Sequence, residues 1–70
     1  MTILRIMGTN SFIKGTQNYM DELESIILTT DPMEAILYDD KNPLIDVEIN
    51  EIAELVNREY NTYLEIITIR

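Results

Sequence analysis

The chain contains no cysteine, no histidine and no tryptophan, and it has only two glycines and two prolines. Without cysteine there is no disulfide framework, and without cysteine or histidine the usual zinc ligands are missing. The commonest general base and the thiol nucleophile are also absent. Two glycines do not make a phosphate-binding loop, and no nucleotide-binding or nucleophile-elbow motif occurs. We therefore expect a protein that is not an enzyme and that uses no cofactor.

Basic residues are scarce: five lysines and arginines face thirteen carboxylates, for a net charge of −8. Residues 1–20 carry Arg5 and Lys14 without any acid, so they contribute +2 and the remaining fifty residues −10. Such a surface repels nucleic acid and anionic membranes, because phosphate binding depends on lysine and arginine. It attracts basic protein surfaces. A charge of this size also serves solubility alone in a small domain.

Long hydrophobic runs are missing, since the longest is the four-residue stretch Ala35–Tyr38. No segment therefore resembles a transmembrane helix, and no apolar run follows a basic start as in a signal peptide. Together with the lack of cysteine, this pattern predicts a cytoplasmic protein. The apolar fraction of 46% is typical of a folded chain, and we expect residues 1–70 to form one small acidic domain.

Four segments have the composition of β-strands. Thr2–Met7 is rich in apolar and β-branched residues and stops at Gly8, and Thr62–Ile69 has a similar character. Between them, Met33–Tyr38 and Leu44–Ile49 read as two strands joined by a turn over Asp39–Pro43. The strand at the C-terminus is expected at an edge of the sheet, where it invites pairing with another chain.

Two segments show apolar stripes at helical spacing. The first follows a cap at Asn18 and the second a cap at Asn50. The stripes consist of Tyr19, Met20, Leu23, Ile26 and Ile27, and of Ile52, Leu55, Val56 and Tyr60. The resulting βαββαβ order predicts a ferredoxin-like α+β fold, a four-stranded antiparallel sheet with two helices on one face. In the alternative, the first helix is shorter, or Leu44–Tyr60 forms one long helix and three strands remain.

The carboxylates do not form a motif for a metal. Asp40 and Asn42 begin like a calcium-binding loop, but Leu44 stands where an oxygen ligand belongs and the glycine of the sharp turn is missing. The pair Asp39–Asp40 lies in a predicted turn, where solvated carboxylates are common. We expect neither a metal site nor a catalytic residue.

The tyrosines divide into two groups. Tyr19 and Tyr60 fall on the helical stripes and are expected in the core, whereas Tyr38 and Tyr63 are expected at the surface. Tyrosine beside carboxylates is a common composition of binding surfaces. The candidate partner-binding residues are Glu34, Tyr38, Asp39, Asp40, Asp46, Glu48, Glu51, Glu54, Tyr63 and Glu65.

Carboxylates spaced along strands and helices can imitate a row of phosphates. In size and acidity, though in no motif, the chain is similar to phage-encoded nucleic-acid mimics, including some anti-CRISPR and anti-restriction proteins. This resemblance implies an inhibitory or regulatory protein that blocks a basic nucleic-acid-handling protein, without binding nucleic acid or membrane itself. The alternative function is a structural or accessory subunit that self-associates, as a weak homodimer, through its C-terminal strand.

Overall fold

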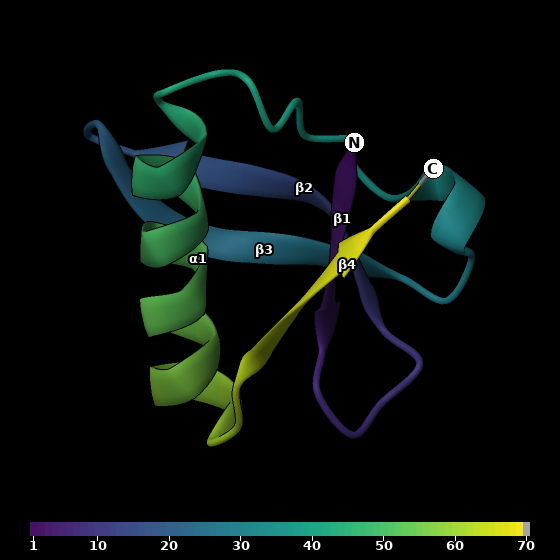
Figure 1. Ribbon diagram of the computed structural model, residues 1–70. Helices are drawn as coiled ribbons and strands as arrows, with labels where there is room; N and C mark the ends of the chain where they lie inside the picture. Colours follow the sequence, from purple (N-terminus) through teal and green to yellow (C-terminus); the bar gives the residue numbers. More distant parts are fainter. Residues whose placement is uncertain (70) are drawn as a thin grey trace.

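The computed structural model describes residues 1–69 and shows one helix beside a strongly bent sheet (Figure 1). The elements follow one another as β1 (Thr2–Ile6), β2 (Phe12–Tyr19), β3 (Glu22–Thr29), the short 3-10 turn η1 (Pro32–Glu34), α1 (Ile45–Tyr60) and β4 (Leu64–Thr68).

The four strands form one antiparallel sheet in the order β3-β2-β1-β4. Strands β1, β2 and β3 are joined in sequence by two hairpin connections. The chain then passes through α1, and β4 pairs with β1. Strands β1 and β2 pair only at Arg5 and Phe12, and the pair β1–β4 crosses the pair β2–β3 steeply (Figure 1). Backbone hydrogen bonds from Ile36 to Ile13 and between Tyr38 and Thr2 fill the gap where β1 and β2 diverge.

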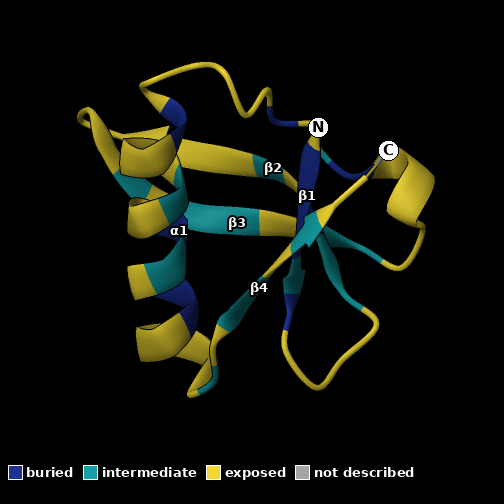
Figure 2. Cartoon of the chain, in the orientation of Figure 1, coloured by how far each residue is buried: buried dark blue, intermediate teal, exposed yellow. Residues whose placement is uncertain are grey.

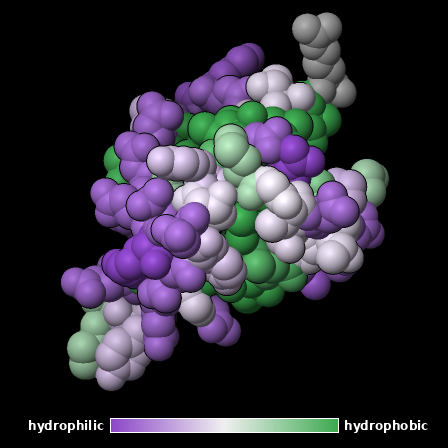
Figure 3. Space-filling view, turned by 90° about the horizontal axis from the view of Figure 1, so that it is seen from below, coloured by the Kyte–Doolittle hydropathy of each residue, from purple (hydrophilic) through white to green (hydrophobic). Residues whose placement is uncertain are grey.

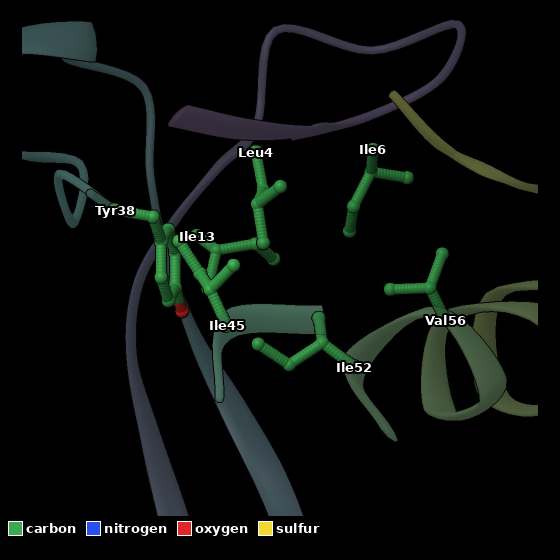
Figure 4. Close-up of a cluster of buried hydrophobic side chains, with 7 residues drawn as sticks. All are labelled: Leu4, Ile6, Ile13, Tyr38, Ile45, Ile52 and Val56. Carbon is green, nitrogen blue, oxygen red and sulfur yellow. The ribbon is translucent and has the colours of Figure 1, made fainter. Parts of the chain in front are cut away.

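The core lies where the inner side of α1 meets the sheet. Seven of the buried side chains form one cluster there, from β1, β2, the segment after η1, and α1 (Figure 4): Leu4, Ile6, Ile13, Tyr38, Ile45, Ile52 and Val56. Buried positions concentrate on β1 and on one side of the helix, while the outer side of the helix is exposed (Figure 2). This single core leaves the outer surface of α1 and the far end of the β2–β3 hairpin free for contacts.

The ferredoxin-like prediction is wrong, because residues 1–69 contain one α-helix and the segment expected to form the first helix is a β-hairpin. Leu23 and Ile26 have helical spacing and both pack on the core. They reach the same face of the sheet through a β-bulge: Gln17 pairs with Ser25 and Asn18 with Leu23, so Glu24 is an extra residue. Because of the bulge, two core-facing residues of a strand, Leu23 and Ile26, have the three-residue spacing that is typical of a helix.

The strands predicted at Met33–Tyr38 and Leu44–Ile49 are also absent. The first segment begins in η1, where the Asp31 carboxylate accepts a hydrogen bond from the Met33 amide at 2.9 Å, and continues as an extended stretch with one bridge at Tyr38. The second segment is the first part of α1. Asn50 therefore lies inside the helix and does not cap it.

The predicted end strands are confirmed; β1 is one residue shorter than expected and β4 three residues shorter. The edge position of the last strand is confirmed too, since β4 pairs with β1 on one side only. The alternative with one long helix anticipated α1, but the sheet has four strands where that alternative left three.

A first prediction concerns the turn between β2 and β3. Its two central residues, Met20 and Asp21, have φ of 51° and 62°, in the left-handed region that favours Asn and Gly. The double variant Met20→Asn/Asp21→Gly should therefore raise the free energy of unfolding by about 0.5–2 kcal/mol. Urea unfolding followed by circular dichroism measures it. As a control of opposite sign, Gly8→Ala should destabilise, because Gly8 has φ of 82°. A double variant less stable than the parent would contradict the turn geometry.

Candidate functional site

Four of the ten candidate binding residues lie together on α1: Asp46, Glu48, Glu51 and Glu54, all exposed. Sequence analysis placed Asp46 and Glu48 on a sheet face, which is wrong. They occupy the first helical turn, where carboxylates interact favourably with the positive end of the helix dipole. The helix thus presents a series of acids over its exposed surface.

Three other candidate acids are engaged in ion pairs away from α1. Glu34 on η1 lies 3.2 Å from the Lys14 ammonium, and Glu65 on β4 lies 2.6 Å from the Arg5 guanidinium. Asp40 lies 3.2 Å from the terminal amino group. The Thr2 hydroxyl donates a hydrogen bond to Asp40, and this bond, followed by the one from the amino terminus, lowers the pKa of the carboxyl.

The remaining acid of the candidate set, Asp39, forms a hydrogen bond within the loop before α1. Its carboxylate accepts a hydrogen bond from the Lys41 amide at 3.0 Å. Four candidate acids therefore lie on separate segments, and each forms an ion pair or a hydrogen bond with residues of the chain itself: Glu34, Asp39, Asp40 and Glu65. The structure does not bring them together with the helical acids.

Sequence analysis missed three acids on the β2–β3 hairpin: Asp21, Glu22 and Glu24. Their segment was expected to form the first helix, and they were not among the candidate binding residues. In the hairpin they are exposed, at the end of β3 that lies beside α1 (Figure 1). The signal that could have found them is Asp21, a turn-forming residue type at the second central position of the turn.

We define the acidic surface as the exposed carboxylates of the hairpin and helix without an ion-pair partner among residues 1–69: Asp21, Glu22, Glu24, Asp46, Glu48, Glu51 and Glu54. Arg58 is the one basic residue on α1, and its guanidinium lies 3.4 Å from Glu59. Hydrophilic side chains crowd the side of the molecule that carries α1, while apolar ones appear toward the middle (Figure 3). Four carboxylates, those of Glu34, Asp40, Glu59 and Glu65, are thus paired within residues 1–69, whereas those of the acidic surface are not; Asp31 and Asp39 also lack an ion pair there but lie on other segments.

A groove of about 240 Å³ lies between the hairpin and α1. Leu23, Ile36 and Ile52 contribute its apolar lining. Its polar lining consists of Thr16, Asn18, Tyr38, Glu48 and Glu51. The groove therefore joins the two halves of the acidic surface and combines negative charge with an apolar floor.

Tyr38 was predicted at the surface, and this is wrong: its side chain belongs to the core and the residue is 7% exposed. Burial of the phenol, and then the nearby negative charge of Glu48, raise the pKa of Tyr38 above its ordinary value. The hydroxyl therefore stays protonated in the physiological range. Tyr38 therefore belongs both to the core cluster and to the lining of the groove.

The other tyrosines are all exposed. The expectation for Tyr63 is confirmed, whereas Tyr19 and Tyr60 were expected in the core and are exposed on the hairpin and at the end of α1. Within residues 1–69, no three acidic side chains gather in a way that could hold a metal ion. Within residues 1–69, helix α1 is not long and apolar enough to cross a membrane.

Comparison with protein-family models, with curated proteins and with solved structures found no match for this chain.

Proposed function

We propose that this chain is a small inhibitory or regulatory protein that occupies the nucleic-acid-binding surface of a basic partner protein. The observation that carries the proposal is the acidic surface, seven carboxylates on the hairpin and α1 without ion pairs among the described residues. A surface that binds phosphates presents lysine and arginine, and these side chains pair equally with carboxylates.

The distribution of basic residues supports the same proposal. Arg5, Lys14 and Arg58 each form an ion pair within the chain, so they offer little to a phosphate backbone. Complementary charge accelerates association and selects among partners more than it adds raw affinity. The composition resembles anti-CRISPR and anti-restriction proteins of phages, so nucleases of those systems are the first partners to test.

A competition experiment tests the proposal. The chain is immobilised, partners are captured from cells and identified by mass spectrometry, and the purified partner is titrated with the chain in the presence of duplex DNA or RNA. Under the proposal, nucleic acid and the chain displace one another from the partner. Simultaneous binding of both would exclude mimicry.

A second candidate function, self-association through β4, is favoured by a separate observation. Strand β4 lies at the sheet edge, and Ile66 on it is 58% exposed although it is a large apolar residue. Tyr63, just before the strand, is 67% exposed. An apolar edge strand offers unpaired backbone groups and apolar area to a second chain.

We expect a weak homodimer through β4 that strengthens with added salt, because the charge of −8 opposes association and salt screens it. Analytical ultracentrifugation over protein and salt concentration measures it. Ile66→Lys should abolish the dimer. Ile27→Lys, a matched change of an exposed isoleucine on the opposite edge strand β3, should leave it intact. A monomer at every concentration, or equal loss in both variants, would rule out assembly through β4.

A further inference from the structure

The groove between the hairpin and α1 contains a polar group without a partner. Tyr38 as a whole residue is 7% exposed, it lines the groove, and its hydroxyl forms no hydrogen bond with another residue in the described part of the chain. The hydroxyl lies at the end of the ring nearest the start of α1 (Figure 4). No buried side-chain oxygen or nitrogen among the described residues lacks a hydrogen-bond partner, so the unpaired Tyr38 hydroxyl reaches solvent, where it is open to a ligand in the groove.

Two acidic residues also line the groove. Glu48 and Glu51 lie three positions apart on α1, so they are neighbours on one side of the helix, and neither forms an ion pair within residues 1–69. The effect of Glu48 on the pKa of Tyr38 shows that its charge reaches the phenol. Hydrogen-bond acceptors and negative charge therefore converge on one place.

We propose that this groove receives an arginine side chain of the partner protein, an inference that rests on the proposed function. A guanidinium offers five donors in a plane, enough for both carboxylates and the Tyr38 oxygen. The aliphatic stem of the arginine can pack against Leu23, Ile36 and Ile52 on the floor. A lysine ammonium offers a compact charge and matches several separated acceptors less well.

The size of the groove agrees with a single side chain. Its volume of about 240 Å³ lies below the range of about 300–1,000 Å³ that is usual for small-molecule sites. The groove also lies inside the acidic surface, so a basic partner steered to that surface brings its arginines to the entrance. The arginine in the groove would fix the orientation of a partner that long-range charge has attracted.

The test uses the amide of N-acetylarginine as probe, titrated into the full chain and followed by amide shifts in NMR. We expect binding with a dissociation constant on the order of millimolar, with shifts centred on the groove. The lysine analogue should bind several-fold more weakly. Equal binding of the two amides, or shifts spread over the whole acidic surface, would overturn the arginine site.

Variants separate the groove from general charge. Glu48→Gln/Glu51→Gln should weaken arginine-amide binding about tenfold, whereas Asp31→Asn/Asp39→Asn, with the same change in net charge at residues that do not line the groove, should change it less than about twofold. Tyr38→Phe keeps the buried ring and the charge and should weaken binding several-fold, with circular dichroism confirming the fold. Unchanged binding in Tyr38→Phe, or equal loss in both acid variants, would overturn the site. A partner still displaced by nucleic acid would then preserve the proposed function, so the two failures are distinguishable.

Discussion

Leu4→Ala is expected to unfold a large part of the molecules at room temperature. Truncation of a fully buried leucine costs about 2–5 kcal/mol, from lost transfer energy and from the cavity that remains. A single core in a chain of this length supplies only about 3–5 kcal/mol of net stability. The loss is therefore comparable with the whole free energy of unfolding.

The position of Leu4 explains the size of the effect. Leu4 is 0% exposed, and in the cluster it lies next to Ile13, with Tyr38 and Ile45 on the far side of Ile13 (Figure 4). These neighbours belong to separate elements, so a cavity at this place loosens the junction between β1, β2 and α1. Neighbours anchored in three elements have little freedom to move into the space.

Urea unfolding measures the change, with Leu44→Ala as the matched control. Leu44 is 68% exposed at the start of α1 and makes no side-chain capping bond, so its truncation should change the free energy of unfolding by less than about 0.5 kcal/mol. Equal effects of the two truncations would contradict the placement of the core on β1.

The end strands could be predicted because their sequences carry a local signal. Thr2–Ile6 combines β-branched and apolar residues and is followed by Gly8, whose φ of 82° ends the strand in a turn. Leu64–Thr68 has the same character. Both strands are set mainly by composition and by a nearby break, and these are properties that a sequence shows directly.

The helix and the hairpin could not be predicted as reliably because each imitates the other's periodicity. In α1, Ile45, Val47 and Ile49 alternate as in a strand, yet Val47 is exposed, and the core contacts come from Ile45, Ile49 and Ile52 at helical spacing. In β3, the extra residue at Glu24 gives a strand helical spacing. Tertiary packing decided both cases, and local pattern does not contain it.

For the candidate site too, the sequence predicted what depends on local composition and did not predict what depends on tertiary packing. The acids of α1 were identified from composition, and they lie together because they are on one helix. The ion pairs that remove Glu34 and Glu65 from the set join residues 20 and 60 positions apart, and the hairpin acids depend on a turn that was missed. Which charges remain uncompensated is a property of the fold, whereas the total charge is a property of the sequence.

The affinity for the partner should fall steeply with salt if the acidic surface is the binding site. Between about 50 and 200 mM salt, we expect a loss of tenfold or more, because several exposed charge pairs are screened together. Isothermal titration at these two concentrations measures the loss. An affinity that does not change with salt would exclude the acidic surface as the main source of binding and would favour an apolar interface.

A matched pair of variants locates the charge that matters. Glu24→Gln/Glu54→Gln removes two carboxylates from the acidic surface, one on each of its elements, outside the groove and outside the first helical turn. Asp31→Asn/Asp39→Asn changes the net charge equally, and asparagine retains the oxygen that accepts the backbone hydrogen bonds there. Both should fold like the parent, since exposed charges contribute only about 0–1 kcal/mol. The first pair should weaken partner binding about tenfold and reduce its salt dependence, and the second should do neither. Equal weakening by both would mean that the partner responds to total charge, and the acidic surface would then have no special role.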